Sequence, residues 1–136
     1  MKAKVLITDD VHPLLLKGLE SRGYEVHYQP DISLAETHER IAGFQALVIN
    51  TKTLADRQLI ERGSGLRWIA RLGSGMEIID QLAARERGVH LISTPEANCN
   101  AVAEHALGML LGLFRNIPRA DRELREKRWE REKNRG

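Results

Sequence analysis

Polar residues that could bind a ligand gather in a few short segments of an otherwise apolar chain. In Gly73-Ser74-Gly75 the two glycines leave backbone N–H groups unblocked. Such a turn between a strand and a helix can hold a carboxylate or a phosphate, helped by the helix dipole. Asn50-Thr51-Lys52 follows another apolar run and adds a hydroxyl donor and a positive charge. The two segments therefore predict an anion-binding site.

Other chemistry has weaker support in the sequence. Glu104 and His105 are adjacent, and neighbouring residues on a helix point about 100° apart, so they do not form an acid–base pair. The five histidines show no metal-ligand spacing, and Cys99, the single cysteine, has no cysteine partner. The sequence contains neither a Gly-x-Gly-x-x-Gly fingerprint nor a P-loop. These residues therefore give no support for an acid–base pair or for a metal site.

The elements that position these segments follow from the hydrophobic period. Short β-rich runs alternate with amphipathic stretches over the first 93 residues. The predicted strands are Lys4–Thr8, Glu25–Tyr28, Ala46–Ile49, Leu66–Ala70 and Val89–Ser93. Two helices are predicted to begin at Pro13 and at a Ser33–Glu36 capping box. Two more are predicted over Leu54–Arg62 and Met76–Arg87, and Asp56 is placed in the first turn of the former. Each amphipathic stretch ends at a glycine suited to a left-handed C-cap, namely Gly23, Gly43, Gly63 and Gly88.

This βα repeat predicts an α/β fold. Right-handed crossovers give a parallel sheet with helices on both faces, and five strands favour the flavodoxin-like order 2-1-3-4-5. Ligands of such sheets bind outside the carboxyl ends of the strands. The segments delivered to that edge are Asp9-Asp10, Asn50–Thr53, Gly73–Gly75 and Thr94–Asn98.

The chain changes character after Asn98. Between Ala101 and Phe114 only Glu104 and His105 are polar, so this helix is apolar almost all the way round and is expected to be covered by other protein. Gly108 and Gly112 lie on one face and would let another backbone approach closely.

Pro118 separates this helix from a charged one predicted over Arg119–Lys133. Acid-before-base pairs are expected between Asp121 and Arg125 and between Glu123 and Lys127. Packing contacts are expected at Ala120, Leu124 and Trp129. The end of the sequence carries no capping signal, so we expect it to be part of a longer protein.

Composition excludes several classes of protein. A chain of 136 residues with 42% hydrophobic residues suits one globular domain and not two full ones. One cysteine allows no internal disulfide and favours a reducing compartment such as the cytoplasm. The longest apolar run, Ala106–Phe114, is far shorter than the roughly 20 residues that span a bilayer. Interleaved charges in the basic tail argue against nucleic-acid binding.

Four segments, in this order, resemble the N-terminal portion of the D-isomer-specific 2-hydroxyacid dehydrogenases, and are most similar to the branch that oxidises 3-phosphoglycerate. The segments are Leu66–Asp80, Gly88–Val89, Thr94–Asn98 and Val102–Gly108. The resemblance implies a substrate-binding domain over residues 1–97. It also implies that residues 98–136 hold an interdomain and dimerisation helix and the truncated start of a Rossmann NAD-binding domain. The implied reaction is reversible hydride transfer between a 2-hydroxy acid and NAD.

The resemblance also implies roles for the residues of the two segments. It makes Asn50, Thr51, Lys52, Gly73 and Gly75 substrate-binding residues, and places Ser74 near the nicotinamide. Asn50 replaces an arginine that is usual in the family, and Ile78 stands where asparagine is common. NAD would be held mainly by the domain that this sequence lacks, as would the catalytic residues. The expected partners are a small 2-hydroxy or 2-keto acid and a second copy of the chain, through residues 101–117.

Two other readings remain open. A phosphoacceptor receiver domain has the same sheet and an acidic pair like Asp9-Asp10, but its third strand should end in an aspartate, and here Asn50 follows that strand. A non-catalytic regulatory module could instead use the apolar helix to bind another protein.

Overall fold

The computed structural model describes residues 2–135, which divide into two units. The first unit extends to Pro95 and the second begins at Glu96. The assignment of residues 1–97 and 98–136 to two functional domains stays a prediction.

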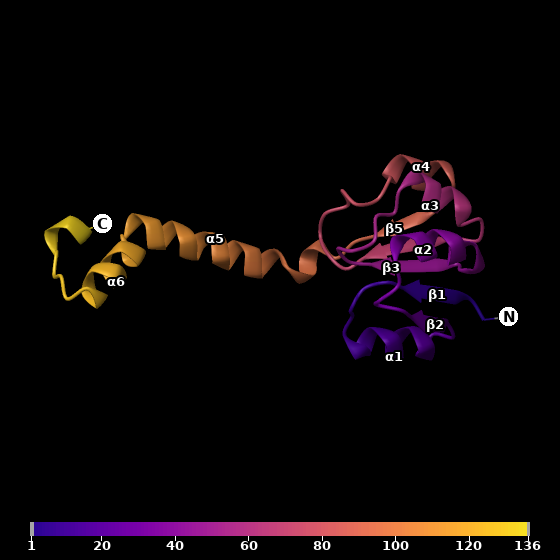
Figure 1. The fold of residues 1–136 in the computed structure, drawn as a ribbon, viewed down its shortest axis with the longest axis horizontal. Coiled ribbons are helices and arrows are strands. Elements are labelled where there is room, and N and C mark those ends of the chain that lie inside the picture. The colour runs from indigo at the N-terminus through magenta and orange to yellow at the C-terminus, as the bar shows by residue number, and fades with distance from the viewer. Residues whose placement is uncertain (1, 136) are drawn as a thin grey trace. The chain divides into compact units, whose positions relative to one another are not determined.

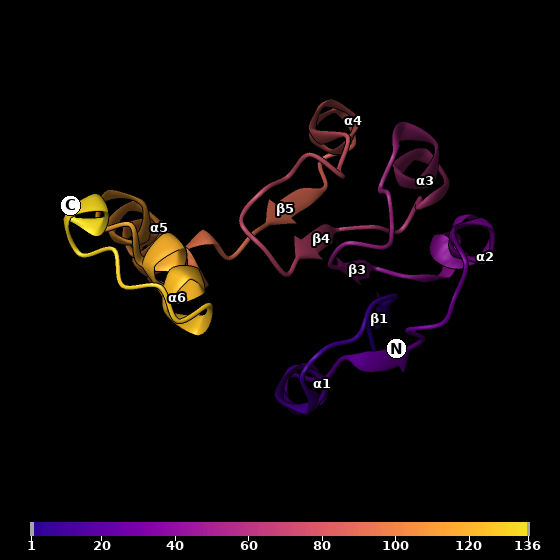
Figure 2. The ribbon, with the colours of Figure 1, turned by 60° about the vertical axis from the view of Figure 1, so that its left-hand side comes forward.

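The first unit is built on a five-stranded parallel sheet with the order β2-β1-β3-β4-β5, which confirms the predicted topology. The strands are β1 (Lys4–Ile7), β2 (Glu25–Tyr28), β3 (Ala46–Ile49), β4 (Trp68–Arg71) and β5 (His90–Ile92). Two of them, β2 and β3, have the predicted bounds. Figure 1 and Figure 2 show α1 (Pro13–Ser21) on one face of the sheet, and α2 (Leu34–Arg40), α3 (Arg57–Arg62) and α4 (Gln81–Glu86) on the other.

Both faces of the sheet are covered, which explains why its central strands are continuous apolar runs. Leu6, Leu47 and Ile69 are paired across β1, β3 and β4, and all three side chains are buried on the face that α3 and α4 cover. Val5 and Val48 are buried on the opposite face, where residues of α1 pack. Successive side chains along each strand thus pack into two hydrophobic layers in turn, one on each face of the sheet.

Helix starts are set by side chains that cap free backbone N–H groups. The Ser33–Glu36 capping box is confirmed, since the Glu36 N–H donates to Ser33 Oγ (3.2 Å) and the Ser33 N–H to Glu36 Oε2 (2.9 Å). The Ser33 hydroxyl also donates to Glu36 Oε2 at 2.6 Å, and this bond, together with the one from the Ser33 N–H, lowers the pKa of Glu36. Asp56 and Asp80 cap α3 and α4 in the same way, each accepting an N–H at 2.8 Å.

These caps make α3 and α4 shorter than predicted. Asp56 precedes α3 and does not lie in its first turn. Residues 76–80 form a loop and not the first turn of α4, because their backbone pairs with Ala55. The Ala55 N–H donates to the Ile78 carbonyl and the Asp80 N–H to the Ala55 carbonyl, both at 2.9 Å.

Only two of the four glycines predicted as left-handed C-caps adopt that conformation. Gly23 (φ 87°) and Gly88 (φ 67°) do, and glycine adopts a positive φ without steric cost because it has no Cβ. Gly63 has φ −73°, and Gly43 lies in a short 3-10 helix, Ile41–Gly43, without a positive φ. At these two ends the chain leaves the helix without a left-handed glycine, so these two predictions were wrong.

The second unit contains α5 (Cys99–Phe114) and α6 (Ile117–Arg125), which pack on each other. Pro118 lies in the first turn of α6, where its missing N–H costs nothing. The apolar side chains of α5 are exposed within this unit, including Leu107 (55%) and Leu110 (48%). Among residues 2–135 no helix is long and apolar enough to cross a membrane.

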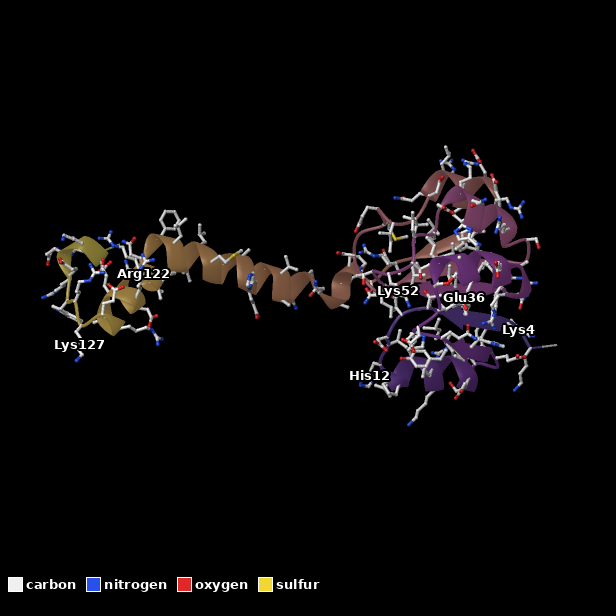
Figure 3. The ribbon with its side chains drawn as sticks, in the orientation of Figure 1. Lys4, His12, Glu36, Lys52, Arg122 and Lys127 are labelled. Carbon is white, nitrogen blue, oxygen red and sulfur yellow. The ribbon has the colours of Figure 1, made fainter. Side chains whose placement is uncertain are left out.

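The charged helix ends earlier than predicted. Lys127 has φ 59° and lies beyond the end of α6 (Figure 3). The expected Glu123–Lys127 pair therefore does not form, and the partners of Glu123 are other residues. Glu123 is buried and accepts hydrogen bonds from Asn134 (2.5 Å) and Arg119 (3.1 Å), which lower its pKa.

The other predictions for this helix have mixed outcomes. The Asp121–Arg125 pair is confirmed at 2.8 Å. Ala120 is half-buried, but Leu124 and Trp129 are exposed, so the packing expected of them was wrong within the described residues.

Candidate functional site

The carboxyl ends of β1 and β3 bring Asp9 against the segment Asn50–Lys52. The Asn50 N–H donates to Asp9 Oδ2 at 2.9 Å, and the Thr51 and Lys52 N–H groups donate to Asp9 Oδ1 at 3.2 and 3.1 Å. Asp9 is buried. Three consecutive amides therefore converge on one carboxylate, which is the geometry of a backbone anion nest.

Two buried threonines continue this network into the sheet. The Thr53 hydroxyl donates to Thr8 Oγ1 at 2.7 Å, and the Thr8 hydroxyl donates to Asp9 Oδ2 at 3.3 Å. Both threonines are almost completely buried, so water does not compete for the hydrogen bonds of their hydroxyls. The segment that follows β3 is thus held at its start by Asp9 and at its end by Thr8.

Lys52 does not stand free as the predicted point charge. Its Nζ donates to the carbonyl of Pro30, in the loop that follows β2. Figure 3 places Lys52 at the opposite end of the sheet from Lys4, which begins β1. At the same edge the Tyr28 hydroxyl donates to Asp10 Oδ1 at 2.9 Å, and this hydrogen bond raises the pKa of Tyr28.

Arg71, the last residue of β4, was not predicted and joins the two candidate segments. Its Nε donates to the Asn50 carbonyl at 3.2 Å. Its Nη1 donates to the Gly75 carbonyl and lies 3.1 Å from Glu77 Oε1. Only 12% of the Arg71 side chain is exposed. A charged residue closing an apolar strand was the one signal in the sequence that could have marked it.

The Gly73–Gly75 loop lies beside Arg71, but not at a helix start. Because α4 begins at Gln81, its dipole does not act on this loop, and that part of the sequence argument was wrong. The loop is fixed by the Thr94 N–H, which donates to the Gly73 carbonyl at 3.0 Å. A Cβ on Gly75 would lie 2.7 Å from Arg71 Nη1 and closer still to Glu77 Oε2.

We expect Gly75→Ala to break the contact between Arg71 and Glu77, because the methyl group takes the space that the two side chains share. The cost in unfolding free energy is expected to be about 1 kcal/mol, since exposed Glu77 can move away. Chemical denaturation measures it. Gly43→Ala, where a Cβ meets nothing within 4 Å, is the control. Equal effects at the two glycines would contradict this prediction.

The predicted site residues therefore share one edge of the sheet. Arg71 connects the Asn50 backbone to Gly75. Ser74 is exposed in the Gly73–Gly75 loop. Substrate and cofactor roles for these residues stay predictions. Residues 2–135 contain no group of three side chains able to hold a metal ion.

Comparison with known families identifies the class of protein to which the chain belongs. Residues 5–129 match the family described as D-isomer specific 2-hydroxyacid dehydrogenase, catalytic domain. This match covers most of the chain, and the chain therefore belongs to that family.

Individual relatives agree with this assignment. The chain is 32% identical to the D-3-phosphoglycerate dehydrogenase of Archaeoglobus fulgidus over 96% of its length, and 35% identical to that of Methanocaldococcus jannaschii over 98%. It spans only 25% of each of these two proteins.

Solved structures show the same fold. The PH0520 protein of Pyrococcus horikoshii is 26% identical, with a TM-score of 0.87, over 96% of this chain and 39% of that one. The NAD+-bound 3-phosphoglycerate dehydrogenase of Entamoeba histolytica is 26% identical, with a TM-score of 0.68, over 85% of this chain and 40% of that one.

Proposed function

We propose that this chain is the substrate-binding portion of an NAD-dependent dehydrogenase that oxidises 3-phosphoglycerate to 3-phosphohydroxypyruvate, a step towards serine. The observation that carries the proposal is the meeting of Asn50–Lys52 and Gly73–Gly75 at one sheet edge, joined by Arg71. Several relatives named D-3-phosphoglycerate dehydrogenase support the choice of substrate. The single cysteine supports a cytoplasmic location.

The proposed role of this chain is to bind and orient the acid. The Gly73–Gly75 loop would hold the substrate carboxylate, and Asn50 and Thr51 would donate hydrogen bonds to the rest of the molecule. Arg71 fixes the separation of the two segments, so that C2 of the acid is held in one place.

NAD would supply the hydride acceptor for this oxidation. Ser74 fits the predicted approach to the nicotinamide because its side chain is exposed at the site edge. The 136 residues contain no dinucleotide fingerprint, so NAD would be held mainly by a part of the parent protein outside this chain. A second copy is proposed to bind through the region 101–117.

Titration of the 15N-labelled chain with 3-phosphoglycerate tests the substrate. We expect the backbone signals of Gly73–Gly75 and the side-chain amide of Asn50 to shift, with D-lactate giving smaller shifts at equal concentration. We also expect no NADH formation by the chain alone. Either shifts confined to other parts of the chain, or NADH formed from 3-phosphoglycerate by the purified chain, would refute the corresponding part of the proposal.

A further inference from the structure

The segment Asn50–Lys52 has no backbone N–H left with which to bind a ligand. All three N–H groups donate to the Asp9 carboxylate, at 2.9 to 3.2 Å. A nest of this kind would otherwise attract an external anion such as a phosphate. Here an internal carboxylate, only 6% exposed, takes the place of that anion.

The other polar groups of this segment are also engaged. The Asn50 carbonyl accepts from Arg71, and the Lys52 ammonium donates to the Pro30 carbonyl. Within residues 2–135, the Asn50 side-chain amide and the Thr51 hydroxyl make no hydrogen bond. Thr51 is exposed and Asn50 is partly exposed, so both groups remain free to meet a ligand.

Burying a charge is expensive unless hydrogen bonds compensate for it, and Asp9 is compensated by the backbone of the very segment that the proposed function assigns to the substrate. Replacing the carboxylate would release those amides and leave the segment free to move. Asp9 itself cannot reach a ligand without giving up these bonds, because both of its oxygens point at the amides.

We propose that Asp9 is a positioning residue. Its carboxylate fills the backbone nest of Asn50–Lys52, so that a ligand meets the side-chain amide of Asn50 and the hydroxyl of Thr51. This inference rests on the proposed function for the identity of the ligand. The organisation of the segment by Asp9 does not depend on it.

The wild-type chain tests the first half of the proposal without any substitution. During titration with 3-phosphoglycerate, and separately with inorganic phosphate, the Asn50 side-chain signals should shift. The Thr51 and Lys52 amides should stay protected from hydrogen exchange. Loss of that protection together with larger shifts of these two amides would show that they bind the ligand, and would overturn the proposal.

Asp9→Asn tests the second half, with Asp56→Asn as the matched control because Asp56 also accepts a backbone N–H but caps α3. In Asp9→Asn, exchange of the Thr51 and Lys52 amides should rise at least about tenfold. The dissociation constant for 3-phosphoglycerate should rise by about fivefold or more. The control should change neither quantity.

Two results would overturn the role of Asp9. One is unchanged exchange at Thr51 and Lys52 in Asp9→Asn, and the other is faster exchange with unchanged affinity for 3-phosphoglycerate. If the wild-type chain does not bind 3-phosphoglycerate at all, the proposed substrate is wrong, and the exchange rates alone then decide whether Asp9 organises the segment.

Discussion

Replacing Leu47 by alanine is expected to lower the free energy of unfolding of the first unit by about 3 kcal/mol. Leu47 is completely buried in β3, between Leu6 of β1 and Ile69 of β4. Strands on both sides hold the backbone in place, so the space left by the leucine cannot close by a local shift. Urea unfolding followed by far-UV circular dichroism measures the loss.

Leu14→Ala provides the matched control, because the same atoms are removed from a side chain that is 71% exposed in α1. That change should alter the free energy of unfolding by less than about 0.5 kcal/mol. A loss below about 1 kcal/mol for Leu47→Ala would mean that β3 is not the centre of the core. Because β3 leads directly into Asn50, so small a loss would also weaken the case that a rigid strand positions the site.

The sheet could be predicted because strands that are buried on both faces have short, continuous apolar sequences. Ala46–Ile49 is apolar throughout, as a central parallel strand must be, and its bounds were predicted correctly. Glu25–Tyr28 in the edge strand β2 was also found from its β-rich composition. The order of the strands was predicted because five strands in so short a βα repeat favour the flavodoxin-like arrangement.

Loop conformations could not be predicted in this way, because tertiary contacts decide them. The hydrophobic period of Met76–Arg87 suits a helix, yet residues 76–80 pair with Ala55 and give up helical hydrogen bonds. Likewise, the pattern of charges favoured a helix through Lys127. The chain turns there instead, and Glu123 finds Asn134 as its partner.

The candidate site was predicted in its parts but not in its connections. Polar and glycine-rich segments at strand ends identified Asn50–Lys52 and Gly73–Gly75. Nothing in the sequence separation of 41 residues between Asp9 and Asn50 indicates that a carboxylate would take up the amides. Arg71 was overlooked for the same reason, since its three partners lie on two different loops.

Glutamine at both Gly108 and Gly112 is expected to weaken self-association of the chain at least about tenfold, if the proposed homodimer forms through residues 101–117. The two glycines share one face of α5, and a Cβ on either would meet nothing within 4 Å in a single copy. That space is where the backbone of a second copy could approach. Two longer polar side chains would fill it and hold the helices apart.

The direction of this effect separates assembly from folding. Glycine is about 1 kcal/mol worse than alanine in a helix interior, and glutamine is a good helix former, so the double variant should make α5 more stable in one copy. Lost self-association therefore cannot be explained by a melted helix. Sedimentation equilibrium gives the dissociation constant, and circular dichroism gives the helix content of the same samples.

Ala106→Gln is the control, because residue 106 lies on the opposite side of α5 from Gly108 and receives a side chain of the same size. It should leave the dissociation constant within about twofold of the wild type. Equal weakening by the control would show that α5 is surrounded on both faces in the assembly. Unchanged association of the double variant would place the subunit contact elsewhere than on the glycine face of α5.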